Sequence, residues 1–162
     1  AELDLVALIR RSADTVAELL RERGALLTLD LPESRAFLRA DPDRLTQVMI
    51  NLLSNAAKFV PAGSGQIRIG LVLQRDRVQV EVQDNGPGVA PEQQALVFEK
   101  FRQGGDASHR PQGTGLGLPI SRQIIEHFGG QIELHSQPGQ GACFSFWLPL
   151  GAPDNDKTGD RA

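Results

Sequence analysis

The stretch VQVEVQDNGPGV, residues 78–89, combines a strand pattern with an acidic residue in an unusual place. Valines at 78, 80 and 82 alternate with glutamine and glutamate, the period of a strand with one buried face. The same alternation puts Asp84 on the valine face. Because a carboxylate that faces a core is costly unless it receives hydrogen bonds, we expect Asp84 to be a buried acceptor. The turn sequence Asp-Asn-Gly also allows a simpler interpretation, in which Asp84 is an Asx-turn residue.

Composition limits the possible classes of protein. The 162 residues fit one domain of 1–150 with a polar, disordered tail or linker at 151–162. A net charge of −3 argues against sequence-independent binding of nucleic acid. The single cysteine, Cys143, excludes an internal disulfide, and the three scattered histidines lack metal-ligand spacing. Because no apolar run reaches about 20 residues and no signal peptide is visible, we expect a cytoplasmic chain without direct membrane contact.

The order of elements predicts an α/β two-layer sandwich. Helices are expected from Asp4 to Gly24, from Asp41 onward, briefly within 90–101, and over 116–130 with Leu116, Ile120, Ile124 and Phe128 on one stripe. Two short strands are expected at 25–31 and 35–40, and two hairpins at 66–84 and 131–150. We therefore predict a mixed, mostly antiparallel sheet of about five strands with three main helices on one face.

The helix that follows Asp41 has polar residues beside its apolar stripe. Asn51, Asn55 and Lys58 fall within an arc of about 60°, at about 100° per residue. This arc borders the stripe, so these side chains can line a cleft. Amide oxygens suit Mg²⁺, and a lysine one turn later suits phosphate. Ordinary solvated polarity near a helix end is the alternative.

Three further segments have compositions that suit a ligand. GTGLGL (113–118) opens a helix, where glycines and backbone N–H groups can hold an anion, although it is neither a Walker A nor a Rossmann motif. A helix entry without ligand is the alternative. RQGGDASHRPQG (102–113) predicts a mobile loop. VFEKF (97–101) supplies Phe98 and Phe101, expected mainly to anchor that loop by hydrophobic packing. A contact with the cleft, with Lys100 and Arg102 facing phosphates, is the alternative.

Together these segments resemble, in order and spacing, the nucleotide-binding domain of bacterial sensor histidine kinases. This domain belongs to the gyrase, chaperone, histidine-kinase and mismatch-repair ATPase superfamily and has the Bergerat-type fold. NLLSNAAKF (51–59) is similar to the N box, DNGPG (84–88) to the first glycine box, VFEKF to the F box and GTGLGL to the second glycine box. The resemblance covers about residues 3–150, and it implies ATP and Mg²⁺ as ligands.

The resemblance also implies a role for individual residues. Asp84 would receive the adenine amino group, Asn55 would bind Mg²⁺, Asn51 and Lys58 would lie near the phosphates, and Phe59 would lie against the base. Residues 102–112 would form a lid, although Gln103 stands where family lids often carry arginine. The remaining nucleotide-binding candidates are Gly86, Gly88, Val89, Phe98, Lys100, Phe101, Arg102, Gly113, Thr114, Gly115, Leu116, Gly117 and Leu118.

Asn51 distinguishes subclasses of the superfamily. Hydrolysing members carry a glutamate four residues before the metal-binding asparagine, and asparagine cannot replace it as a general base. The resemblance therefore implies a kinase domain that binds ATP, hydrolyses it poorly and, with Asn51, Asn55 and Lys58 as catalytic residues, phosphorylates a histidine on a separate helical dimerisation domain. The parent kinase could be membrane-anchored.

The histidines in this chain do not match the family's phosphoacceptor pattern. We expect structural or surface roles for His127 and His135, and only His109 could contact phosphate. The expected partners are the helical domain and a response regulator, with the isolated domain monomeric. A serine kinase of the anti-sigma-factor type and a nucleotide-sensing interaction module without transfer activity are the alternatives, and a mechanical ATPase is the weakest.

Overall fold

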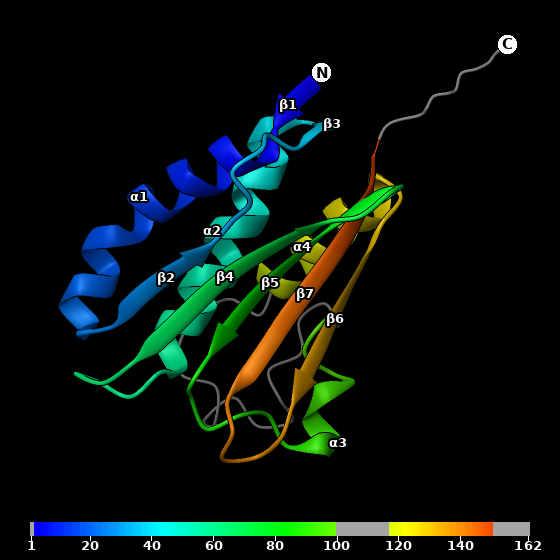
Figure 1. The fold of residues 1–162 in the computed structure, drawn as a ribbon. Helices are drawn as coiled ribbons and strands as arrows, with labels where there is room; N and C mark the ends of the chain where they lie inside the picture. The colour runs from blue at the N-terminus through cyan, green and yellow to red at the C-terminus, as the bar shows by residue number, and fades with distance from the viewer. Residues whose placement is uncertain (1, 100–116, 151–162) are drawn as a thin grey trace, which may run out of the picture.

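The computed structural model describes residues 2–99 and 117–150 and contains two sheets (Figure 1). Its elements, in chain order, are β1 (Glu2–Asp4), α1 (Leu5–Arg23), β2 (Leu26–Asp30), β3 (Phe37–Arg39), α2 (Pro42–Phe59), β4 (Gln66–Leu73), β5 (Arg77–Asp84), α3 (Pro91–Gln94), α4 (Gly117–His127), β6 (Gln131–Ser136) and β7 (Ala142–Pro149). None of the helices in the described ranges is long and apolar enough to cross a membrane.

The main sheet has five strands in the order β2-β4-β5-β7-β6. Only the β2–β4 pair is parallel, so the sheet is mixed and mostly antiparallel, as predicted. Both predicted hairpins, β4–β5 and β6–β7, are confirmed. The two short strands predicted at 25–31 and 35–40 exist, but they do not pair with each other. Instead β3 pairs with β1, a three-residue strand too short to be predicted from its pattern.

Helices α1, α2 and α4 lie on one face of the main sheet and form the second layer of the sandwich (Figure 1). The alternating valines of β5 point into the space between the layers, and Val78, Val80 and Val82 are at most 1% exposed. Helix α2 lies between α1 and α4 and contacts both. The predicted two-layer sandwich is therefore confirmed, with α2 as its central helix.

The ends of the first two helices follow the predicted capping signals. The Asp4 side chain accepts a hydrogen bond from the Val6 N–H at 3.1 Å, and Asp41 does the same for the Asp43 N–H at 2.9 Å. At the end of α1, Gly24 adopts φ +70°, the left-handed conformation that suits glycine. These local signals fix where α1 begins and ends and where α2 begins.

Two further predicted helices are confirmed, but they differ from the expectation in length and in the positions that are buried. The helix expected within 90–101 is only the four residues of α3, which has no side-chain cap and buries none of its residues. On α4, the residues that are buried are Leu118, Pro119, Ser121, Ile124 and Ile125, whereas Ile120 and Phe128 of the predicted stripe are half-buried. Leu116 lies outside the described residues. A hydrophobic pattern could not identify Ser121 as a buried position.

Removal of a large side chain from this core should be costly. Phe146, 2% exposed, lies on β7 opposite Val80 of β5 and Ile132 of β6. We predict that Phe146→Ala lowers the free energy of unfolding by about 3–5 kcal/mol, because it leaves a cavity between the layers. Leu26→Ala, at a position that is 65% exposed, is the control and should change it by less than about 1 kcal/mol. Equal effects in urea denaturation would contradict this account of the core.

Candidate functional site

A cavity of about 640 Å³ lies where β5 ends, beside the last turn of α2 and the start of α4. Most of its wall is apolar and is formed by side chains such as Val97, Leu118 and Phe144. Asp84 and Asn55 add a carboxylate and an amide. The complete lining is Asn55, Phe59, Asp84, Pro87, Gly88, Val89, Ala90, Glu92, Gln93, Val97, Leu118, Ala142 and Phe144. Such a cavity suits a flat, largely apolar ligand that carries a few polar groups.

Asp84 is a buried carboxylate in the wall of this cavity. Its side chain is on the valine face of β5, as predicted, and the residue is 7% exposed. Burial raises the pKa of the Asp84 carboxyl, while hydrogen bonds from the backbone N–H groups of Gly86 and Ala142 act in the opposite direction. The Gly86 N–H lies 2.8 Å from Oδ1, so the Asx-turn interpretation also holds. An ionised carboxylate can accept further hydrogen bonds beyond these two.

Glycines allow the chain after Asp84 to pack against its neighbours. A Cβ atom on Gly86 would lie 2.7 Å from the carbonyl oxygen of Phe59, at the end of α2. Gly88 has φ +82°, and a Cβ there would lie 2.4 Å from the carbonyl oxygen of Gln137. A side chain at Gly86 or Gly88 would force the backbone there away from Phe59 or Gln137. Gly86 therefore lets the chain after Asp84 pack against the end of α2, and Gly88 lets it pack against the turn between β6 and β7.

The polar residues of α2 separate into different environments. Asn55 and Phe59 line the cavity. The Asn51 amide is turned toward α4, where Nδ2 donates to the carbonyl oxygen of Gly117 and to Oγ of Ser121, both at 3.2 Å. Lys58 is exposed and does not line this cavity. The structure thus brings Asn55 and Phe59 together with Asp84, and it makes Asn51 a tie between α2 and α4.

The other predicted residues are distributed unevenly around the cavity. Gly88, Val89 and Leu118 line it, whereas Gly117 borders Asn51. Phe98 packs edge-on against Phe144 with ring centroids 5.9 Å apart, which confirms its predicted hydrophobic role, but it is not part of the lining. The predicted site residues that lie outside the described part of the chain are Lys100, Phe101, Arg102, Gly113, Thr114, Gly115 and Leu116, and the predicted lid at 102–112 lies there too.

Several lining residues were missed from the sequence. Ala142 and Phe144 reach the cavity because β7 pairs with β5, so that Ala142 is opposite Asp84 and Phe144 opposite Val82. This pairing joins segments far apart in the chain, and no local pattern reveals it. A second group lies within or soon after the first glycine box: Pro87, Ala90, Glu92, Gln93 and Val97. Its proximity in sequence to Asp84 was the signal that could have identified it.

The described histidines and acids do not form a metal centre. Within residues 2–99 and 117–150, no group of three His, Cys, Asp or Glu residues could hold a metal ion. His127 stacks edge-on against Phe128 with centroids 5.0 Å apart, and Nε2 of His135 lies 3.1 Å from Oε1 of Glu133. These contacts confirm the structural and surface roles predicted for both. His109 lies outside the described residues.

Comparison with known proteins gives a family match and a set of similar sequences. Residues 40–152 match the family described as histidine kinase-, DNA gyrase B-, and HSP90-like ATPase. The circadian input-output histidine kinase CikA of Synechococcus elongatus is 41% identical over 150 residues, which cover 90% of this chain and 20% of CikA. The chain thus spans about one fifth of the length of this curated relative.

Solved structures resemble the whole fold. The catalytic domain of histidine kinase ThkA matches with a TM-score of 0.81 and 30% identity over 93% of this chain and 97% of that domain. ThkA in complex with response regulator protein TrrA matches at 0.76 and 29%, over 93% of this chain and 42% of that one. Full-length ShkA in complex with AMPPNP matches at 0.80 and 31%, over 94% and 31%. The ThkA match extends over nearly all of both chains.

The raised pKa of Asp84 predicts a pH-dependent gain of stability in Asp84→Asn. A raised pKa means that the fold favours the neutral acid over the carboxylate. Ionisation of Asp84 therefore destabilises the fold above that pKa, and the penalty fades as the pH falls toward the ordinary value of 3.8. Asparagine is always neutral and keeps an acceptor for the Gly86 N–H.

We therefore expect the Tm of Asp84→Asn to exceed that of the parent at about pH 7, and the difference to close as the pH is lowered to about 4. Thermal unfolding followed by circular dichroism measures both. Asp14→Asn, an exposed acid on α1, is the matched control and should stay close to the parent. A difference that is independent of pH would contradict the claim that burial makes the Asp84 charge costly.

Proposed function

We propose that this chain binds Mg²⁺–ATP and transfers the γ-phosphate to a histidine of another domain. The premise is that the chain belongs to the family of histidine kinase-, DNA gyrase B- and HSP90-like ATPases, as a catalytic domain of the histidine kinase type. The observation that carries the proposal is Asp84, a carboxylate that is 7% exposed in the wall of a mostly apolar cavity. The acceptor histidine would come from the helical domain of the parent kinase.

The cavity fits an adenine base. Adenine combines apolar ring faces with an exocyclic amino donor, and Asp84 is an acceptor with capacity beyond the N–H groups of Gly86 and Ala142. Phe59, Val89 and Leu118 provide apolar surface in the same cavity. Base recognition would therefore use one charged hydrogen bond and apolar contact.

The phosphates and the metal would lie toward Asn55 and the start of α4. Asn55 offers an amide oxygen in the lining, and Mg²⁺ in nucleotide sites is commonly held by one or two protein ligands together with phosphate oxygens and water. That arrangement suits a chain whose described residues contain no metal-binding cluster. Once bound, the ion would neutralise phosphate charge. The complex of the similar protein ShkA with AMPPNP supports a triphosphate ligand.

Asn51 supports transfer over hydrolysis. An amide cannot remove a proton from water at neutral pH, and both donors of this one are directed to Gly117 and Ser121 on α4. Among the described residues, His127 and His135 are engaged with Phe128 and Glu133. A histidine nitrogen from outside this chain would attack the γ-phosphorus as the bond to the ADP oxygen breaks.

The downstream partner would be a response regulator, as the complex of the similar protein ThkA with TrrA suggests. The domain would act in the cytoplasm, where ATP is available. The rival functions are a serine kinase of the anti-sigma-factor type and a nucleotide-sensing module without transfer activity. A serine kinase of that type usually retains the glutamate that Asn51 replaces, so the histidine kinase is the better supported proposal.

Transfer can be tested with the helical domain of the parent kinase supplied as a separate polypeptide. The proposal predicts that incubation of the two with γ-labelled ATP puts an acid-labile phosphate on a histidine of the helical domain, and that the chain alone releases little phosphate. Acid-stable label on serine would support the rival kinase. ATP binding without any label on the helical domain would contradict the transfer activity.

The metal assignment gives a separate prediction for Asn55→Ala. Loss of the amide oxygen should remove most of the Mg²⁺-dependent part of ATP affinity, by about tenfold or more, and leave the affinity in EDTA nearly unchanged. Calorimetric titration with and without Mg²⁺ measures both affinities. Gln83→Ala, which removes an exposed amide from β5, is the control and should behave like the parent. If the parent binds ATP equally well in EDTA, the metal assignment is wrong.

A further inference from the structure

The last turn of α2 needs external partners for its carbonyl groups. An α-helix leaves its final carbonyls without partners inside the helix, and such ends fray. Here Asn55 and Phe59, which line the cavity, both belong to the last five residues of α2. The Val60 N–H satisfies the carbonyl of Ala56 at 3.1 Å. The carbonyls that follow can be satisfied by water or by donors from elsewhere in the molecule.

Arg23, the last residue of α1, supplies these donors. Its Nε donates to the carbonyl of Ala57 at 2.8 Å, and its Nη2 donates to those of Val60 at 2.6 Å and Lys58 at 3.3 Å. One guanidinium thus binds three carbonyls at the end of α2. Its positive charge also lies at the negative end of the α2 dipole.

Backbone contacts hold Arg23 in this position. The Gly63 N–H donates to the Arg23 carbonyl at 2.9 Å, and the Leu26 N–H donates to the carbonyl of Gly65 at 2.9 Å. A Cβ atom on Gly24 would lie 2.7 Å from Cα of Gly63, so the turn after α1 lies directly against the segment after α2. The end of α1 and the end of α2 are therefore locked together.

The contact continues from the end of α2 into the cavity. The carbonyl oxygen of Phe59 lies where Gly86 approaches α2, at 2.7 Å from the position of a Cβ on Gly86. Gly86 in turn donates its N–H to Asp84. A shift of the last turn of α2 would therefore move Phe59 and Asn55 relative to Asp84.

We propose that Arg23 is a positioning residue for nucleotide binding, because it holds the last turn of α2 in the conformation that completes the cavity. This inference rests on the proposed function for its ligand. Arg23 does not line the cavity and acts through α2. If the last turn is ordered in only a fraction of the molecules, the apparent affinity for ATP falls to that fraction of its full value.

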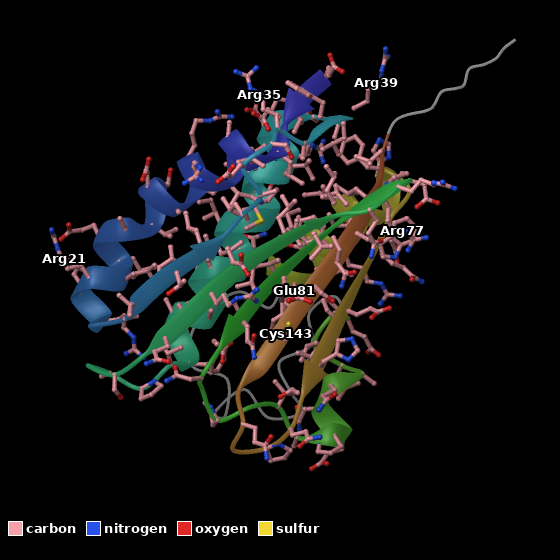
Figure 2. The ribbon with its side chains drawn as sticks, in the orientation of Figure 1. Arg21, Arg35, Arg39, Arg77, Glu81 and Cys143 are labelled. Carbon is pink, nitrogen blue, oxygen red and sulfur yellow. The ribbon has the colours of Figure 1, made fainter. Side chains whose placement is uncertain are left out.

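Arg21 provides a matched control. It is an arginine in the same turn of α1, but its Nη2 pairs with Glu18 of the same helix. Figure 2 shows Arg21 on the outward side of the end of α1, away from the sheet. Replacement of Arg21 removes the same charge and side-chain volume without removing a partner of α2.

The experiment compares the parent chain with Arg23→Ala, Arg23→Lys and Arg21→Ala. Calorimetry with Mg²⁺–ATP, at a temperature where circular dichroism shows each chain to be folded, should give an affinity about tenfold lower for Arg23→Ala and unchanged for Arg21→Ala. Arg23→Lys should be intermediate, since an ammonium carries a charge but lacks the planar fork of donors. In ¹H–¹⁵N spectra without ligand, the Asn55 and Phe59 signals should shift or broaden in Arg23→Ala, while that of Glu133 on β6 stays in place.

The outcomes separate the two proposals. A folded Arg23→Ala variant with parental affinity and parental Asn55 and Phe59 signals would overturn the positioning role, even if that variant were less heat-stable. If the parent does not bind ATP, the proposed function fails, and the ligand-free spectra still decide whether Arg23 holds the last turn of α2 in place. If Arg23→Ala does not fold, Arg23→Lys and Arg23→Gln carry the same comparison against Arg21→Ala.

Discussion

A buried carboxylate is the constraint on which the rest of this structure depends. Asp84 ends a central strand of the main sheet, is 7% exposed and has a raised pKa because of its burial. Two backbone N–H groups, from Gly86 and Ala142, partly offset the cost of its charge. A fold that keeps an acid in such a place loses stability at neutral pH, and a ligand that donates a hydrogen bond to the acid would recover part of it. The position makes chemical sense when a ligand supplies that donor.

Helix α2 forms the opposite side of the cavity and is tied on both flanks. Arg23 joins its last turn to α1, and Asn51 joins it to α4 through Gly117 and Ser121. Along the chain, Asn55 lies between Asn51 and the carbonyls that Arg23 binds, and Phe59 lies among those carbonyls. Two kinds of contact therefore form the cavity. Hydrogen bonds between strands place Asp84, and the packing of α2 against α1 and α4 places Asn55 and Phe59. Contacts outside the cavity, such as those of Arg23, can therefore decide how α2 is placed relative to Asp84.

Much of this arrangement could be predicted from the sequence, because its signals are local. The valine alternation put Asp84 on the buried face, and Asp4, Asp41 and Gly24 marked helix ends. Features that depend on contacts between distant segments could not be predicted. The β5–β7 pairing brings Phe144 into the cavity, and the bonds between Asn51 and α4 turn a predicted phosphate ligand toward a neighbouring helix. Ser121 is a polar residue at a buried position, which a hydrophobic pattern misses.

Comparison of ATP with inosine triphosphate tests the central claim most directly, because the two nucleotides differ at the position that Asp84 is proposed to bind. ATP carries an amino donor there, whereas inosine triphosphate carries an oxygen acceptor that faces the carboxylate unfavourably. Calorimetric titration of the parent chain should therefore give an affinity for ATP at least about a hundredfold higher. Equal affinities for the two nucleotides would contradict adenine recognition by Asp84.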